Sequence, residues 1–200
     1  MRAGITVMVV IAAVGFVGGA TAVNRTLAYN NSGDYRCGFA YSGQSTLAIP
    51  WKNDSANPPT GIYQTVFDQA QESWNVGPHP AYFQSSTLNH KRAAKNDGTG
   101  GPRGHIDRYC GDYRDSTAWY VNKQHPQLTD PVYGDFWKQS AAAHESGHHI
   151  WASHSNVSDA LMNSNRGTLY NGPIQDDNCA IQQRYPSTAW PLQCGYSGGP

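Results

Sequence analysis

A short run in the second half of the chain, Ala141 to Ser164, reads AAAHESGHHIWASHSNVSDALMNS. His144 and His148 stand four residues apart in it, after three alanines, which are strong helix formers. An α-helix has 3.6 residues per turn, so both imidazoles would project from one face and could reach a single ion. We therefore expect a helix over Phe136 to Ile150, with Asp135 as its N-cap.

Glu145, the residue after His144, adds a carboxylate to this pair of histidines. Glu145 makes HESGH fit the pattern HExxH, in which two histidines bind Zn²⁺ and the glutamate acts on the water that the metal activates. A carboxylate beside the metal can accept the proton of that water and later deliver it to the leaving amine. A purely structural zinc site has no use for such a group. The chain has two glutamates, Glu72 and Glu145, so a chance placement of one between the histidines is less expected.

Two further residues follow in order. His154 stands six residues after His148, and Met162 lies within SDALMN. With these residues the chain resembles the metzincin clan of zinc endopeptidases, most closely its matrixin-like branch, whose pattern is HExxHxxGxxH followed by a methionine-containing turn. The resemblance implies that His144, His148 and His154 bind one catalytic zinc ion and that Glu145 is the general base and acid. It also implies that Met162 packs beneath the histidines, which is compatible with ordinary core packing.

One position departs from the family pattern. Trp151 stands where those proteins usually have a glycine, at the point where the helix ends and the chain turns back. A residue other than glycine in the left-handed conformation costs about 1–2 kcal/mol. We expect either a shifted turn or strain at Trp151, and the position of His154 depends on which occurs. His149 would point about 100° round the helix from His148, away from the metal, as a packing or surface residue.

The N-terminal segment, residues 1–22, has the features of a secretory signal peptide: a basic residue, an apolar run from Ile5 to Val17 and a small-residue ending. The apolar run is shorter than the ~20 residues that span a bilayer. We expect cleavage at the end of this segment, a flexible lead-in over 23–36 and one catalytic domain over 37–200. The mature protein would be secreted, extracellular, monomeric and free of membrane contact.

Export makes the cysteines informative, because an even set usually pairs in an oxidising compartment. The spacing favours one disulfide in the C-terminal region and one long-range disulfide, although three connectivities are open. The sequence YRCGF around Cys37 is similar to the Arg-Cys-Gly of the matrixin pro-segment, where a thiolate caps the zinc. The short stretch before the first expected strand favours a disulfide at Cys37 over this zymogen switch. The favoured pairs are Cys37 with Cys110 and Cys179 with Cys194.

Length and composition predict a single domain, and the resemblance implies that its fold is α+β. The resemblance implies a small twisted mixed β-sheet with an active-site helix and a C-terminal helix, and Thr117–Asn122 as the edge strand ahead of the active-site helix. We interpret His90 to His105 as a glycine-rich surface loop. The other expected elements are a strand over Thr46–Trp51, a helix from Thr60 or Gly61 to Trp74, a strand over Ala81–Ser86 and a helix from Asp176 or Asp177 to Tyr185.

Four histidines lie outside the motif. The resemblance suggests that such residues could bind a structural calcium ion or a second zinc ion. The relevant stretch contains His90, Asp97, His105 and Asp107. Their spacing does not match a known ligand pattern, so we interpret them as solvated loop residues. We interpret the remaining two histidines, His79 and His125, as loop residues in the same way.

The formal net charge of +0 and the pI of about 7.1 give no basic surface for nucleic acid. The leading hypothesis is a secreted zinc endopeptidase whose protein or peptide substrate lies extended along the edge strand. The alternative is a secreted binding or adhesion module that a zinc ion stabilises without turnover. Glu145 counts against that alternative. A zinc hydrolase of another clan, with a downstream glutamate as third ligand, is disfavoured because no glutamate follows Glu145.

Overall fold

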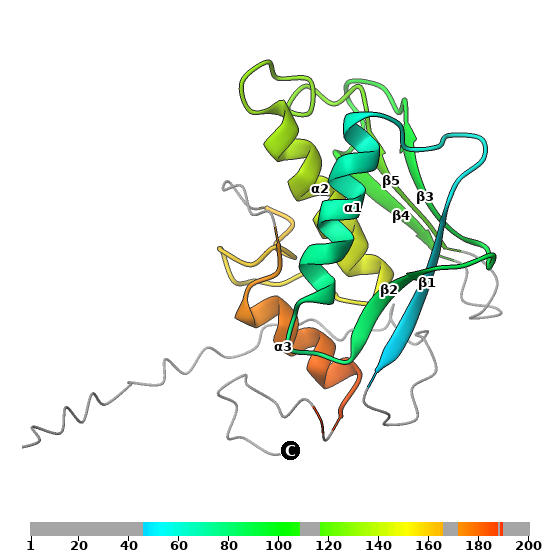
Figure 1. The fold of residues 1–200 in the computed structure, drawn as a ribbon. Helices are drawn as coiled ribbons and strands as arrows, with labels where there is room; N and C mark the ends of the chain where they lie inside the picture. Colours follow the sequence, from blue (N-terminus) through cyan, green and yellow to red (C-terminus); the bar gives the residue numbers. More distant parts are fainter. Residues whose placement is uncertain (1–45, 109–116, 166–171, 188, 190–200) are drawn as a thin grey trace, which may run out of the picture.

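The structure is a computed structural model that describes residues 46–108, 117–165, 172–187 and 189. The described part is an α+β arrangement of one mixed five-stranded sheet and three helices (Figure 1). The segments expected as signal peptide and lead-in lie outside it. Within the described ranges, no helix has the length and apolar character needed to cross a membrane.

The sheet has the strand order β2-β1-β3-β5-β4. Neighbouring strands run parallel except β4, which is antiparallel to β5. A strand pair that is parallel needs a crossover connection, and a helix provides it between β1 and β2. The strands are β1 (Leu47–Asn53), β2 (Ala81–Ser85), β3 (His90–Lys95), β4 (Gly104–Arg108) and β5 (Thr117–Asn122).

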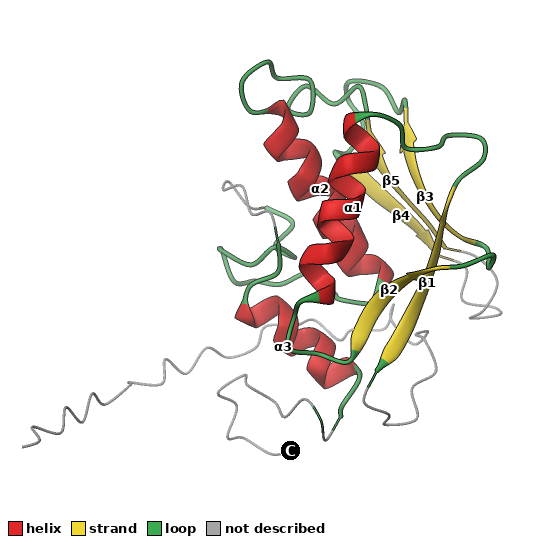
Figure 2. Ribbon diagram, in the orientation of Figure 1, coloured by secondary structure: helices red, strands yellow, loops and turns green. Residues whose placement is uncertain are grey.

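Helices α1 (Ile62–Asn75) and α2 (Gly134–His149) lie side by side against one face of the sheet, and α3 (Gln175–Arg184) lies across their lower ends (Figure 2). The two long helices approach closely because α2 presents small residues to α1. The indole of Trp74 in α1 is fully buried, and its Nε1 donates a hydrogen bond to the carbonyl of Ala143 at 2.9 Å. This contact fixes α2, the expected active-site helix, against the core.

The structure confirms the expected helix around the histidine pair but not its cap. Tyr133 occupies the N-cap position of α2, and Asp135 lies in the first turn, where it pairs with Lys138 at 2.5 Å. The turn before the helix is instead held by Asp130, whose Oδ1 accepts the backbone N–H groups of Val132 and Tyr133. A local pattern could not distinguish these two aspartates, because each precedes a helical turn.

The interpretation of residues 90–105 as a loop is wrong at both ends and correct for residues 96–103 between them. The segment contains β3 and leads into β4, joined by the glycine-rich residues between them. β3 was not predicted because an arginine is typical of an exposed segment, whereas Arg92 is fully buried in the fold. A buried arginine requires partners, and here residues distant in the chain supply them. Its guanidinium bonds to Asn53 of β1 at 2.8 Å and to Gln71 and Asp68 of α1 at 2.6 and 2.7 Å.

The expectation that Thr117–Asn122 forms the edge strand is also wrong. This strand, β5, lies inside the sheet and pairs with β3 on one side and with β4 on the other. The edge next to it is β4, of which only the first two residues fall within the predicted loop. Any ligand that adds to this side of the sheet would therefore meet β4.

Candidate metal centre

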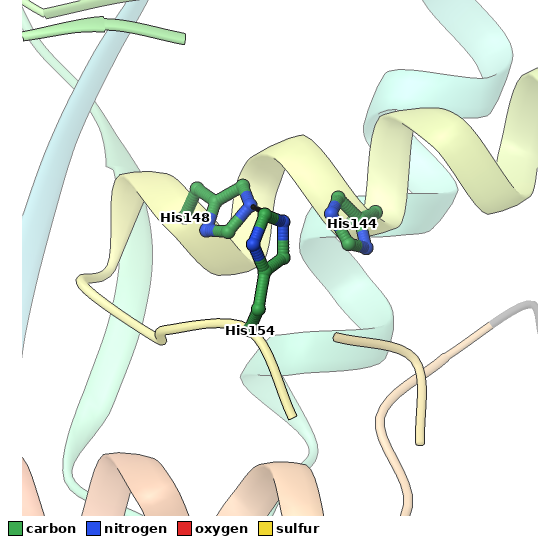
Figure 3. Close-up of side chains that lie close together, drawn as sticks. All are labelled: His144, His148 and His154. Atoms are coloured by element: carbon green, nitrogen blue, oxygen red, sulfur yellow. Dashed lines mark hydrogen bonds between the residues drawn. The ribbon is translucent and has the colours of Figure 1, made fainter. Parts of the chain in front are cut away.

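Three histidine side chains converge at the C-terminal half of α2. His144 and His148 project from the helix, and His154 comes from the segment that follows it; Figure 3 shows the rings turned toward one another. One nitrogen from each ring lies within 4.8 Å of the others, and the Nε2 atoms of His148 and His154 are 3.0 Å apart. Among the described residues, this is the one group of three or more metal-binding side chains close enough to hold an ion.

Backbone carbonyls fix the orientation of the two helical histidines. Nδ1 of His144 lies 2.8 Å from the carbonyl oxygen of Leu161, and Nδ1 of His148 lies 2.8 Å from that of Ala152. A carbonyl only accepts, so each Nδ1 carries the proton and each Nε2 keeps its lone pair. Such outer hydrogen bonds orient the ligands of protein metal sites and raise their basicity.

The donor set fits zinc. Three neutral imidazoles are typical ligands of a catalytic zinc site, which keeps a fourth position open. Zn–N bonds of about 2.0–2.1 Å in tetrahedral geometry place two nitrogens about 3.3 Å apart, close to the 3.0 Å between His148 and His154. The trio can therefore hold a metal ion, with His144 and His148 buried and His154 exposed.

The turn after α2 shows which of the two outcomes expected at Trp151, a shifted turn or a left-handed residue, occurs. Trp151 has φ of 72° and is the only non-glycine residue with positive φ among those the structure describes. Its N–H bonds to the carbonyl of His148 and the N–H of Ala152 bonds to that of Gly147, the hydrogen-bond pair that ends a helix in the Schellman motif. The turn is thus not shifted: Trp151 takes the left-handed conformation, and His154 reaches the other two histidines.

Met162 is fully buried and lies against α2 at Gly147. Its sulfur packs against the backbone of Gly147, where a Cβ atom would also come within 2.6 Å of the Trp74 ring. The glycine between Glu145 and His148 is therefore needed for space. It lets Met162 and Trp74 approach the helix from the same side.

Asp177 of α3 holds the segment around Met162 in place. Its carboxylate accepts the backbone N–H groups of Leu161 and Met162, each at 2.9 Å, and that of Ile174 at 2.9 Å. Burial raises the pKa of Asp177, while these hydrogen bonds oppose the rise. Because the carbonyl of Leu161 orients His144, the start of α3 is linked to the metal centre through one turn of backbone.

Glu145 is buried beside the trio and faces the edge strand. A Cβ atom on Gly104, the first residue of β4, would lie 2.6–2.9 Å from the side chain of Glu145. A side chain at this position would require the Glu145 carboxylate to move. The neighbouring Arg103 lies near enough for the charge of Glu145 to favour its protonated form, although burial lowers the pKa of Arg103 overall.

Three residues that shape this site had no predicted role in it. Gly104 and Arg103 belong to the stretch interpreted as a loop, and Asp177 was expected only as a helix start. A weak signal existed for Asp177, since an acidic residue in the first turn of a helix often caps backbone N–H groups. No local signal could show that the backbone groups it caps include those of Leu161.

The remaining histidines are placed differently from one another. His149 is buried and points away from the trio, as expected: its ring stacks on Trp119 at 3.9 Å and its Nε2 lies 3.0 Å from the carbonyl of Pro50. His79 and His90 are buried, so their interpretation as solvated residues is wrong. His105 is exposed, but it lies in β4 and pairs with Asp107 at 3.1 Å. His125 is partly exposed and lies in the turn after β5, as expected.

The cysteine predictions fall mostly on residues that the structure does not describe. Cys179 lies in α3 and is disulfide-bonded, and its partner is outside the described residues. Cys37, Cys110 and Cys194 are also outside. Their pairing, and the choice between a disulfide and a zymogen switch at Cys37, stay predictions.

Comparison with known proteins finds no family model that matches the chain and no curated protein that it matches significantly in sequence. The chemistry of the site therefore has to be argued from its own residues.

Proposed function

We propose that this chain is a secreted zinc endopeptidase that hydrolyses peptide bonds with Glu145 as the general base. The observation that carries the proposal is the conjunction of three convergent imidazoles with a buried carboxylate next to the first of them. A trio of histidines alone would explain metal binding. Glu145 is the residue that metal binding leaves unexplained, because it is not a member of the ligand group.

In this proposal the histidines bind the metal ion and Glu145 transfers the proton. His144, His148 and His154 would hold the ion, and zinc bound there would supply a water of lowered pKa and polarise the carbonyl of the scissile bond. Glu145 accepts the proton of the attacking water and delivers it to the nitrogen of the leaving amine. Its side chain lies close to the backbone of Gly104, at the start of β4.

Edge strand β4 is the proposed docking site for the substrate. It has β5 as a partner on one side, and no described strand pairs with its other side. An extended peptide can add to such an edge through backbone hydrogen bonds. Because β4 begins at Gly104, against Glu145, a peptide on this edge would bring its backbone to the carboxylate.

The alternative from another class is a secreted binding or adhesion module that zinc stabilises. The buried positions of His144 and His148 would serve that role equally well. The two hypotheses differ in what they require of Glu145. Only the endopeptidase needs its carboxylate for turnover.

The deciding experiment uses the chain from Val23 onward, loaded with zinc, and compares wild type with Glu145→Ala. We expect about one zinc ion per chain in both proteins and hydrolysis of casein by the wild type alone, with a chelator abolishing it. The matched control is Glu72→Ala, which removes the other glutamate from an exposed position on α1 and should retain activity. Zinc binding without hydrolysis of casein or a broad peptide library by the wild type would support the binding module instead.

A further inference from the structure

Arg103 stands at the point where the edge strand meets the proposed general base. It precedes Gly104, whose backbone packs against the side chain of Glu145. The carbonyl of Arg103 accepts the N–H of Asn122 at 2.9 Å, which ties this residue to the end of β5. The backbone of Arg103 is therefore held in a fixed place beside Glu145.

The guanidinium group of Arg103 lies over the ring of Trp137 in α2, 4.9 Å from its centroid. Trp137 and Glu145 are eight residues apart on α2, so they share one face of the helix. The arginine is half-buried. A guanidinium held over an aromatic ring by a cation–π contact keeps N–H donors that can bind a ligand.

Arg92, which is fully buried, differs from Arg103 in the partners of its guanidinium group. The guanidinium of Arg92 bonds to Asn53, Gln71 and Asp68 and serves the fold. No described residue accepts a hydrogen bond from the guanidinium of Arg103 or forms an ion pair with it. A guanidinium has five N–H donors and stays charged in proteins, so a half-buried one without acceptors is poised for an anion.

The positive charge of Arg103 interacts with two titratable neighbours, Glu145 and His125. It lies near Glu145, and burial together with the charge of Arg103 lowers the pKa of His125 on the neighbouring turn. His125 is partly exposed, and its Nδ1 accepts the N–H of Gln127. Arg103 therefore places a positive charge beside Glu145.

We propose that Arg103 is a specificity-determining residue that binds a carboxylate of the substrate near the scissile bond. This inference rests on the proposed peptidase function and names the class of peptide that it would prefer. The planar fork of an arginine matches a carboxylate with two parallel hydrogen bonds. The carboxylate belongs to an aspartate or glutamate side chain near the cleavage site or to the free C-terminus of a short peptide.

The test compares zinc-loaded wild type with Arg103→Gln and Arg103→Lys. Each protein digests a proteome-derived peptide library, and mass spectrometry identifies the new termini. Peptides chosen from the wild-type cleavage sites are then measured in pairs, an acidic residue against its amide and a free C-terminus against a C-terminal amide. The matched control is Lys138→Gln, which removes the same charge from α2 on the side that faces Tyr63 of α1.

For the wild type we expect a preference for acidic residues at one fixed position, or for cleavage at a fixed distance from the C-terminus. Arg103→Gln should lower kcat/KM for the preferred peptide by about tenfold to a hundredfold. It should leave the amide counterpart, the zinc content and the thermal unfolding temperature nearly unchanged. Arg103→Lys should fall between the two, because it keeps the charge but loses the fork. Lys138→Gln should behave as wild type.

Two results would overturn the role of Arg103 while leaving the peptidase intact: cleavage by the wild type with no preference for a carboxylate, or a preference that survives in Arg103→Gln. An equal loss on the acidic and the amide peptides would also overturn it, since that would indicate a structural role. Failure of zinc-loaded wild type to cleave any peptide would contradict the peptidase function, and this inference with it.

Discussion

The carbonyl oxygen of Leu161 lies 2.8 Å from Nδ1 of His144 and so determines which ring nitrogen faces the other two histidines. Leu161 is held in turn by Asp177, which accepts its backbone N–H at 2.9 Å. The metal centre therefore depends on a residue of α3 that touches no metal-binding side chain in the trio. This dependence leads to the first prediction.

Asp177→Ala should weaken zinc binding about tenfold to a hundredfold, because the outer hydrogen bond that orients His144 would lose its support. The loss of three buried hydrogen bonds should also lower the free energy of unfolding of the metal-free protein, by about 1–3 kcal/mol for the first donor left unpaired. A competition titration with a chromogenic chelator measures the first effect and urea unfolding the second. Asp135→Asn, at an exposed position, is the control; unchanged zinc affinity in Asp177→Ala would contradict the link.

Gly147→Ala should destabilise the protein by about 1–3 kcal/mol, the usual cost of overpacking a core. The added methyl group would meet the sulfur of Met162 and, at 2.6 Å, the ring of Trp74. Gly100→Ala is a matched control, because a Cβ atom there meets nothing within 4 Å. Urea unfolding of both variants provides the comparison. Equal stability of the two would show that Met162 and Trp74 can move aside.

Gly104→Ala should reduce turnover while leaving zinc bound. The methyl group would lie within 2.6–2.9 Å of the Glu145 side chain, so the carboxylate must turn away, whereas the three histidines are not displaced. A misplaced general base costs up to the 10²- to 10⁴-fold that general base catalysis contributes. Activity per bound zinc ion is the measurement. Full activity at normal zinc content would mean that Glu145 does not need its present orientation.

Trp151→Gly should be more stable than Trp151→Ala by about 1 kcal/mol, although alanine is the better residue in most helical contexts. Both variants lose the buried indole, so their difference isolates the backbone conformation with φ of 72°. Glycine adopts that conformation without the steric penalty that alanine incurs. The free energies of unfolding in urea, both with chelator present, decide the point. An alanine variant at least as stable as the glycine variant would exclude a left-handed residue at this position.

The stability of the protein should fall as the pH drops from about 6.5 to 4, in part because of His79. Burial lowers the pKa of His79 from 6.5 to about 4 in the folded protein. Between these values the unfolded chain holds a proton that the folded chain does not, so protonation favours unfolding, by at most about 3 kcal/mol below pH 4. The change is absent above pH 6.5.

Replacing His79 by glutamine tests this pH dependence. Thermal unfolding of the metal-free protein, measured from pH 4 to 8, should show a smaller loss of stability in His79→Gln than in wild type. Metal-free protein is used so that release of zinc from the trio does not enter the comparison. Parallel profiles for the two proteins would show that His79 is not the group responsible.

The sequence was most informative where chemistry and helical periodicity coincide. His144, Glu145 and His148 could be placed on one helix because three alanines precede them and because four residues return a side chain to the same face. The helix over Ile62–Asn75 and the strands at Leu47–Asn53 and Thr117–Asn122 were also recognisable from local pattern. The left-handed turn at Trp151 was foreseen as one of two outcomes, but its choice required the tertiary structure.

The wrong predictions share one physical cause: polar side chains are buried in the fold among residues that are distant in the chain. β3 escaped recognition because Arg92 looks like a surface residue until Asn53, Gln71 and Asp68 surround it. His79 and His90 looked solvated for the same reason. The wrong edge strand followed from the missed β4, since a strand is at an edge only relative to the others in the sheet.

The sequence by itself determined which side chains could bind a metal ion and which carboxylate stands next to them, because those features lie within one helical segment. The tertiary structure alone decided that His154 returns to the pair, that Asp177 and Leu161 orient His144, and that Gly104 and Arg103 face Glu145. These relationships join residues that are far apart in the chain. Their geometry is set by how α3 holds the backbone of Leu161 and Met162 and by how β4 packs against α2, and local residue preferences do not encode these contacts.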